Sequence, residues 1–264
     1  MSIDAEVLLK RYIPFNKPVP YKDLLVYPVR LCDMSMTEKA LDLLQINKNE
    51  LGELEFISIS NLRFFLILLE EMPEFGDSFE YLFRKILDVP DNYAIQKYLS
   101  GDDEFLAIGE IISHSDGEVF IREETLTKID SKDFDEIRRI VLYQTFPDFS
   151  EKYVDPDIKR KTEEYYRLKN KNAKHVTLEH KMTCVQARTG MTPEQIGDLT
   201  IRNFYQLFDV LVDRDEYIIC KNAEFNNTKF KDPIEHWAYK EKKDKYSEAF
   251  CDADSFISQV QSVN

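Results

Sequence analysis

The sequence has little glycine, one tryptophan and no closely spaced pair of cysteines. Its 264 residues include 7 Gly, 1 Trp and 4 Cys. So few glycines argue against a fold built on Gly-rich loops, and there is no GxGxxG or P-loop motif to cradle a phosphate. The most apolar run, Leu62 to Leu69, is interrupted by Arg63 and is too short to span a bilayer. These absences disfavour nucleotide-binding enzymes and membrane-spanning proteins.

The cysteines lie far apart in the sequence, at Cys32, Cys184, Cys220 and Cys251. None of them forms a CxxC pair of the kind found in zinc sites and redox motifs. The first residues, MSIDAEVLLKRYIPF, do not have the pattern of a secretory signal peptide. Together these features predict free thiols in a reducing cytoplasm.

Charge is abundant but unevenly distributed. The formal net charge is −14, and 32% of the residues are charged. Residues 1–150 hold 16 Lys/Arg against 29 Asp/Glu, whereas residues 151–264 hold 19 against 20. An acidic half repels nucleic acid and anionic membranes, and it is compatible with a solvated surface or with a basic partner. Hydrophobic content of 43% supplies a core for one large domain or two modest ones.

Apolar periodicity predicts several helices. After a short N-terminal helix and an extended Pro-containing arm to residue 20, Tyr21–Leu31 is expected to be an extended, edge-type segment. Ser35 and Glu38 form a capping-box pattern that would open the next helix. The expected helices cover 35–46, 61–71, 78–87, 133–145, 157–173 and 178–188, the last ending at Gly190.

One stretch changes to the pattern of strands. Phe105–Ile112 and Glu118–Ile121 are apolar runs separated by HSDG, in which Asp116 and Gly117 are a turn signal. The expected fold class is therefore α+β and mostly α, with two helical regions interrupted by a small β-hairpin. The corresponding regions are 1–100, helical with an extended arm; 101–150, hairpin plus helix; and 151–264, helical.

The segment from Met191 to Tyr217 is the most informative part of the chain. Thr192 can cap a helix, Pro193 suits its first position, and Gln195 completes a capping box. A second helix is expected to start at Thr200. Its polar positions form a narrow stripe: Arg202, Gln206, Asp209 and Asp213. Most of its circumference must therefore be covered, by this chain or by another.

We expect two apolar sectors on that helix. One sector, with Phe204 and Phe208, would belong to the chain's own core. The other, with Tyr205, would be offered to a partner, because a tyrosine ring supplies apolar area while its hydroxyl tolerates water. The alternative, that all of these residues lie in the core, stays open because broad apolar faces usually lie inside.

No catalytic, metal or cofactor site is predicted, and we do not expect an enzyme. His175 and His180 are five residues apart, which is not the HExxH spacing. His180 and Cys184 are four apart, but zinc binding or Cys–His catalysis needs further groups that the nearby sequence does not supply. The acidic run 102–104 lacks calcium-loop spacing.

The best case for nucleic-acid binding is the basic stretch 159–174. It contains Lys159, Arg160, Lys161, Arg167, Lys169, Lys171 and Lys174, interleaved with Tyr165 and Tyr166. Asp157, Glu163 and Glu164 dilute this charge, and the two glutamates are spaced to pair with Arg167 along a helix. A nucleic-acid-associated regulatory protein is therefore the alternative function, and it ranks second.

Several segments resemble a protein family of large tailed bacteriophages. They are PVPYKDLLVYPVRL, LLQINKNELGELEFISISNLRFFL, FDEIRRIVLYQTFPDFSEKYVDPDIKRK, YYRLKNKN, TGMTPEQIGDLTIRNFYQLFD and IEHW. The resemblance runs from about Pro18 to Lys245 and is made of packing residues, without a catalytic signature. Proteins of this family are encoded among tail and baseplate genes and are described as tail-assembly chaperone-like. The segment after Glu224 departs from the family because it has no glycine-containing turn.

The resemblance implies a non-enzymatic tail or baseplate assembly protein, a chaperone or an adaptor, whose partner is another tail protein. Such a protein would act in the host cytoplasm during assembly, and retention in the virion tail is compatible with the role. Helix-in-groove recognition with aromatic anchors would supply the affinity. The candidate partner-binding residues are Tyr205, Leu25, Tyr27 and Trp237.

Overall fold

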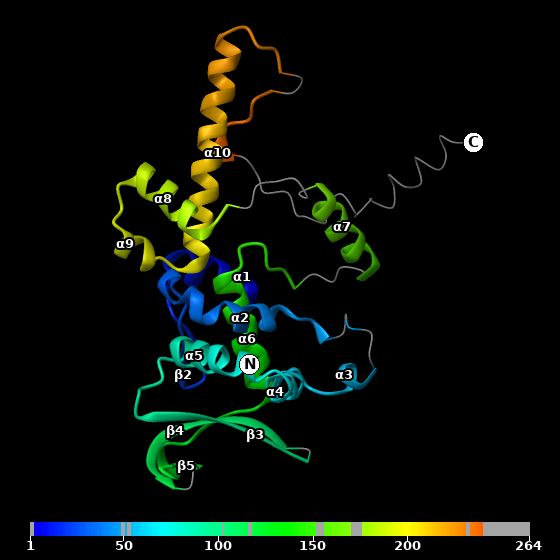
Figure 1. Cartoon of the computed structure of the whole chain (residues 1–264), viewed down its shortest axis with the longest axis vertical. Helices are drawn as coiled ribbons and strands as arrows, with labels where there is room; N and C mark the ends of the chain where they lie inside the picture. The colour runs from blue at the N-terminus through cyan, green and yellow to red at the C-terminus, as the bar shows by residue number, and fades with distance from the viewer. Residues whose placement is uncertain are drawn as a thin grey trace, which may run out of the picture. The chain divides into compact units, whose positions relative to one another are not determined.

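The structure is a computed structural model that describes residues 3–48, 51, 54–101, 103–115, 118–151, 156–169, 176–230 and 233–239. The chain divides into two compact units. Unit 1 comprises Met1–Phe149 and Thr192–Gln206, and unit 2 comprises Ser150–Met191 and Leu207–Asn264. Figure 1 labels most of the helices and strands. The mostly helical α+β class predicted from the sequence is confirmed.

The N-terminal region of unit 1 begins with a short helix, as predicted. Helix α1, Ala5–Val7, continues as a π-helical turn over Leu8–Tyr12 and a 3-10 turn over Ile13–Phe15. Strand β1, Val19–Tyr21, then pairs antiparallel with β2, Leu24–Val26. The turn between the two strands places Lys22 in the left-handed region at φ 51°. The expected extended segment thus contains β2, but its pairing with β1 was not predicted.

Helix α2 covers Met34–Gln45, close to the predicted range, but the predicted capping box is wrong. Ser35 lies inside the helix, which follows directly from a 3-10 turn over Leu31–Asp33. The residue at the N-cap is Asp33, and its side chain makes no capping bond. Its carboxylate instead accepts a 2.6 Å hydrogen bond from the Tyr81 hydroxyl. A tertiary contact therefore replaces the local one.

Four further helices are described in the first 149 residues, and three of them match the predicted ranges closely. They are α3, Leu54–Ser58; α4, Asn61–Glu71; α5, Gly76–Ile86; and α6, Ser131–Thr145. The Ser60 side chain caps α4 by accepting from the Arg63 N–H, and the Asp130 side chain caps α6 by accepting from the Asp133 N–H. Side-chain caps satisfy backbone donors that have no partner inside the helix. The short helix α3 was not predicted.

The predicted hairpin is confirmed, and it belongs to a larger sheet. Its strands are β4, Asp103–Ser115, and β5, Glu118–Ile121, which pair antiparallel with an irregularity between Ile111 and Ser113. Strands β3, Tyr93–Ser100, and β6, Thr127–Ile129, also pair with β4 and make a four-stranded sheet. A Cβ atom at Gly109 would lie 2.2 Å from Cγ2 of Ile121. Glycine at this position lets β5 fold closely against β4.

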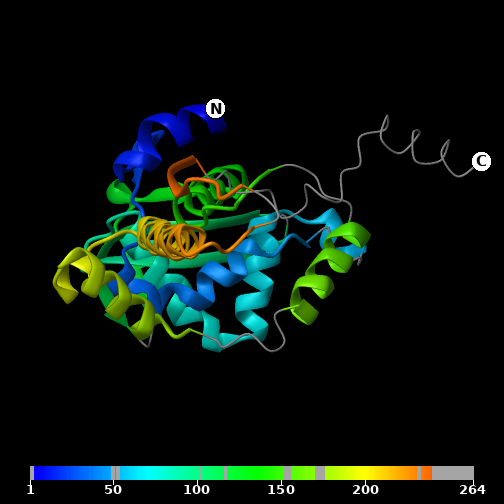
Figure 2. The same cartoon turned by 90° about the horizontal axis from the view of Figure 1, so that it is seen from above.

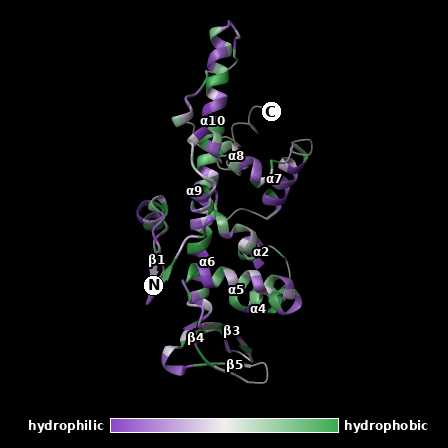
Figure 3. Ribbon diagram, turned by 60° about the vertical axis from the view of Figure 1, so that its left-hand side comes forward, coloured by the Kyte–Doolittle hydropathy of each residue, from purple (hydrophilic) through white to green (hydrophobic). Residues whose placement is uncertain are grey.

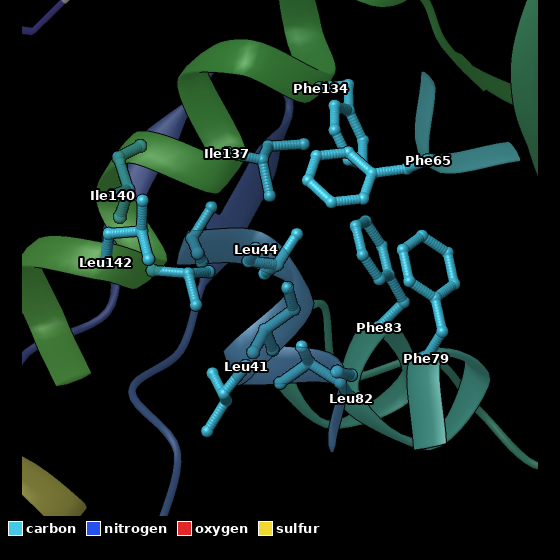
Figure 4. Close-up of a cluster of buried hydrophobic side chains, with 14 of the residues drawn as sticks. Leu41, Leu44, Phe65, Phe79, Leu82, Phe83, Phe134, Ile137, Ile140 and Leu142 are labelled. Carbon is cyan, nitrogen blue, oxygen red and sulfur yellow. The ribbon is translucent and has the colours of Figure 1, made fainter. Parts of the chain in front are cut away.

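The core of unit 1 lies between its helices and one face of this sheet. Phe79 and Phe83 of α5 stack on each other at 4.5 Å, and Phe83 stacks on Phe134 of α6 at 5.9 Å. Figure 4 shows these rings among leucines and isoleucines of α2, α5 and α6. The sheet contributes Leu106 and Ile129, which are fully buried. Figure 1 and Figure 2 show α4 and α5 along the sheet, and α4 contacts both β3 and β4.

Four helices follow α6 in the described part of the chain. They are α7, Pro156–Lys169; α8, Leu178–Thr189; α9, Pro193–Gly197; and α10, Ile201–Phe225. Helix α8 ends at Gly190 with φ 74°, as predicted, and the capping box of Thr192 and Gln195 is present. The predicted helix 157–173 is confirmed to residue 169, since residues 170–173 lie outside the described part. Helix α10 extends twelve residues beyond the predicted end at Asp213.

Candidate protein interface

The first turns of α10, residues 201–206, belong to unit 1 and are anchored in it. Ile201 and Phe204 are buried, and the Thr200 hydroxyl caps the helix by accepting from the Asn203 N–H at 3.2 Å. The isolated bridge between Arg30 and Thr200 adds backbone pairing next to this start. The start of α10 is thus fixed by burial, by a cap and by backbone hydrogen bonds.

Arg202 was predicted to lie in a polar stripe, and this prediction is wrong. Its side chain is buried, and its guanidinium donates to the carbonyl oxygens of Tyr143 and Phe146, both at 2.8 Å. These carbonyls lie at the C-terminal end of α6, where the last C=O groups of a helix lack internal partners. Burial lowers the pKa of Arg202, yet an arginine stays protonated. A spacing pattern could not show this role, because the acceptors lie almost sixty residues away.

Tyr205 also belongs to the anchored part of α10. Its ring is half-buried against the core of unit 1 and meets Phe204 edge-on at 5.4 Å. Its hydroxyl lies 3.9 Å from Sδ of Met34, and burial raises the pKa of the phenol. Tyr205 was predicted to bind a partner, but most of its side chain therefore contacts the core of unit 1.

From Leu207 onwards α10 belongs to unit 2, where α8 packs against it. The Lys181 ammonium lies 5.7 Å from the centroid of the Phe208 ring, and Arg188 pairs with Asp215 at 2.6 Å. Between these two contacts on α8 lies Val185, which is fully buried. Among the described residues of unit 2, Val185 is the one buried hydrophobic side chain.

From Val210 onwards, α10 carries a series of exposed apolar side chains, two of them within the stretch that α8 contacts and three beyond it. We call this set the distal α10 surface; it consists of Val210, Val212, Ile218, Ile219 and Phe225. Ile219 is 68% exposed and Phe225 92% exposed. Figure 3 shows hydrophobic and hydrophilic residues interleaved along this helix. Scattered exposed apolar residues are common. Here Val212 and Ile219 share one helical face, and Ile218 and Phe225 share another, so the distal α10 surface consists of two short apolar strips.

Three of these five residues lie beyond the helix end that the sequence predicted at Asp213. The run Tyr217–Ile219 and Phe225 carried a signal, because Leu211, Ile218 and Phe225 are spaced seven residues apart. That spacing continues one helical face.

Trp237 is held beside α10 in a short 3-10 turn, Trp237–Tyr239. It is half-buried, and its ring stacks on His236 with centroids 5.5 Å apart. His236 in turn packs edge-on against Tyr217 of α10 at 4.8 Å. This places the second predicted partner-binding residue next to the distal α10 surface.

Leu25 and Tyr27, the other predicted contact residues, lie in unit 1. Leu25 is 44% exposed on β2, opposite Pro20. Tyr27 is half-buried, and its backbone N–H donates to the carbonyl of Ile86 at 2.7 Å. The four predicted residues are therefore divided, with Trp237 in unit 2 and the other three in unit 1.

The basic stretch on α7 is offset by its own acidic residues. Arg160 pairs with Asp157 at 3.0 Å. Arg167 lies 3.8 Å from Glu164, and this second pair was predicted from the helical spacing. Tyr165 and Tyr166 meet edge-on at 5.4 Å. Lys171 and Lys174 lie outside the described residues. The two arginines of α7 are thus paired with acidic residues of the same helix, which does not favour a phosphate-binding surface.

The candidate metal pair also stays incomplete where the structure describes it. His180 and Cys184 are exposed on α8. In the described ranges, no three His, Cys, Asp or Glu side chains come together to hold a metal ion. Cys32, Cys184 and Cys220 are free thiols, whereas Cys251 and His175 lie outside these ranges.

Comparisons of the chain with protein-family models, with curated proteins and with solved structures found no match. Within the described part of the chain, no helix combines the length and the apolar character needed to cross a membrane.

Proposed function

We propose that this protein is a non-enzymatic bacteriophage tail or baseplate assembly protein, a chaperone or adaptor that binds another tail protein. The resemblance of segments between Pro18 and Lys245 to a phage tail family supports the biological setting. The observation that carries the binding role is the distal α10 surface, a helix segment with exposed valine, isoleucine and phenylalanine side chains. Such a surface accepts an apolar segment of a partner, and burial of that segment drives the association.

The charge distribution supports the same assignment. Unit 1 holds 17 Lys/Arg against 31 Asp/Glu, so the whole net charge of −14 belongs to it. Unit 2 holds 18 of each and is neutral. A charged unit keeps a protein soluble, while a neutral unit with apolar side chains does not repel a charged partner. The net negative charge thus belongs to unit 1, whereas the distal α10 surface belongs to unit 2.

The central test is a substitution on the distal α10 surface. Ile219→Asp places a charge on a side chain that is 68% exposed, so folding is expected to stay intact. Binding of a tail protein is expected to weaken by about tenfold or more, because a buried unpaired charge at an interface costs well over 1.4 kcal/mol. Affinity purification of tagged protein from infected cells, with mass spectrometry of the co-eluting proteins, measures this loss.

The matched control is Leu168→Asp on α7, a leucine that is 60% exposed in the same unit. This variant is expected to retain the tail protein at the level of the unchanged chain. If no tail or baseplate protein co-elutes with the unchanged chain, the proposed function is wrong. If both variants retain the same protein, the function stands but the binding surface lies elsewhere.

A further inference from the structure

Strand β3 lies at one border of the four-stranded sheet, and some of its backbone groups point away from the sheet. Residues of an antiparallel strand alternate between those that bond to the neighbouring strand and those that do not. The Asn92 carbonyl accepts from the Ile111 N–H at 2.8 Å, so it points toward β4. Tyr93 points the other way, because its carbonyl accepts from the Arg84 guanidinium at 2.9 Å and its N–H donates to the Pro90 carbonyl at 3.0 Å.

The register of β3 on β4 is uninterrupted, so the same alternation assigns the rest of the strand. Ile95, Lys97 and Leu99 follow Tyr93 in steps of two, and their N–H and C=O groups therefore point outward. Among the described residues, β4 is the one strand that pairs with β3, and no hydrogen bond reaches these outward groups. We call the three residues the β3 edge. Free backbone groups of this kind can pair with an extended segment of another chain.

The apolar side chains of the β3 edge indicate what such a segment would contain. Ile95 and Leu99 pack against the core of unit 1, so they lie on the face of the sheet that meets the helices. Side chains directly opposite each other in an antiparallel pair lie on the same face. An added strand with apolar residues opposite Ile95 and Leu99 would therefore extend the apolar layer beside the helices.

Lys97, between these two residues, opposes pairing with a second copy of the chain. Its side chain is exposed and makes no ion pair with a described residue. Its ammonium lies beside the start of α5, where a Cβ atom added to Gly76 would be 3.7 Å from Nζ. Two copies that paired all three edge residues antiparallel would set Lys97 opposite Lys97, and like charges directly opposite are destabilising. A carboxylate in that position is instead attracted to the unpaired ammonium.

We propose that the β3 edge binds an extended segment of a partner protein as an added antiparallel strand, with apolar residues opposite Ile95 and Leu99 and an acidic residue opposite Lys97. The backbone ladder supplies the affinity, and the side chains select the segment and its register. This inference goes beyond the proposed function, because the β3 edge belongs to unit 1 and the distal α10 surface to unit 2.

The test uses the full-length protein and the capped peptide Ser-Val-Thr-Asp-Thr-Val-Ser, whose aspartate would face Lys97 and whose valines would face Ile95 and Leu99. Amide hydrogen exchange, measured by nuclear magnetic resonance, reports on each N–H separately. In the free chain, the amides of the β3 edge should exchange faster than those of Gln96 and Tyr98, which point toward β4. Saturation with the peptide should slow the edge amides by about tenfold or more. A peptide N-methylated at its aspartate and valines lacks the required donors and should not protect them.

The charge preference is tested with a matched peptide in which lysine replaces the aspartate. This peptide should bind the original chain about two- to fivefold more weakly, and Lys97→Glu should reverse the order of the two peptides. The control is Lys128→Glu, at an exposed lysine of β6 on the other side of β4, which should keep the original order.

Edge amides that exchange equally fast with and without the aspartate peptide would overturn the proposal. An order of peptides that Lys97→Glu leaves unchanged would overturn the acidic residue opposite Lys97. Protection that rises with protein concentration in the absence of peptide would show that a second copy occupies the edge, and the proposal would again be wrong. Failure to capture a tail protein would instead count against the proposed function, because peptide binding is measured on the purified chain.

Discussion

Unit 1 and unit 2 differ in how many of their apolar side chains they bury. Unit 1 buries phenylalanines, leucines and isoleucines of α4, α5, α6 and β4 in one core. In unit 2, the described helices leave valine, isoleucine and phenylalanine side chains in solvent, and Val185 alone among those residues is a buried hydrophobic. Burial of apolar area is the main source of folding free energy. Unit 1 therefore has a core of its own, whereas the described helices of unit 2 have exposed apolar area that the proposed partner would cover.

The comparison is sharpest within α10, whose two parts belong to different units. Phe204 is fully buried in unit 1, while Phe208, one turn later, is half-buried in unit 2. We expect Phe204→Ala to lower the free energy of unfolding by roughly 3–5 kcal/mol and Phe208→Ala by about 1 kcal/mol. Urea unfolding of the two variants measures the difference. Equal losses would mean that the two units form one cooperative core.

A second pair of substitutions compares two arginines of the same helix. Arg202→Met is expected to cost about 2 kcal/mol, because the buried carbonyls of Tyr143 and Phe146 lose a charged donor. Arg214→Met, at an exposed position of unit 2, should change stability by less than about 0.5 kcal/mol. Thermal or urea unfolding checks both values. If Arg202→Met left the free energy of unfolding unchanged, water would replace the guanidinium as the donor to these carbonyls.

Alkaline pH should weaken unit 1 through the contacts of Asp33. Hydrogen bonding to Asp33 raises the pKa of Tyr81, and attraction to Asp33 raises the pKa of Lys85. Both groups hold their protons more tightly in the folded state, so their stabilising contribution is complete below the unfolded pKa. It is lost as pH rises above about 10 through the folded values. Urea unfolding at pH 8 and pH 11 should show the loss, and Tyr81→Phe should reduce it.

The smallest expected effect is the salt dependence of DNA binding by α7 of unit 2. If α7 contacted four phosphates, log K for DNA binding would fall with log salt concentration at a slope of about −3.6. We expect weak binding and a slope near zero, since Arg160 and Arg167 already face Asp157 and Glu164. Fluorescence anisotropy with a generic duplex at several salt concentrations measures the slope. A steep slope that Arg160→Gln reduces would favour the alternative function.

Local signals predicted much of the fold. Helix α4, the end of α8 at Gly190 and the capping box of Thr192 and Gln195 were all predictable, because caps and apolar periodicity depend on residues within one or two turns. The capping box expected at Ser35 failed because Asp33 and the preceding turn start α2 earlier. Strands β3 and β6 were not predicted. Their short apolar patterns indicate strands only once their pairing partner β4 is known.

The candidate interface, too, has features that local sequence signals predict and others that depend on tertiary contacts. The sequence by itself determined that the helix after Thr200 carries more apolar surface than a solvated helix needs, since the count of polar positions on a helix does not depend on its neighbours. Which residues stay exposed was decided by tertiary structure. Tyr205 rests on the core of unit 1, and Arg202 is buried on the carbonyls that end α6. Ile219 and Phe225 remain in solvent because none of the described helices covers them, and burial depends on contacts that no local pattern records.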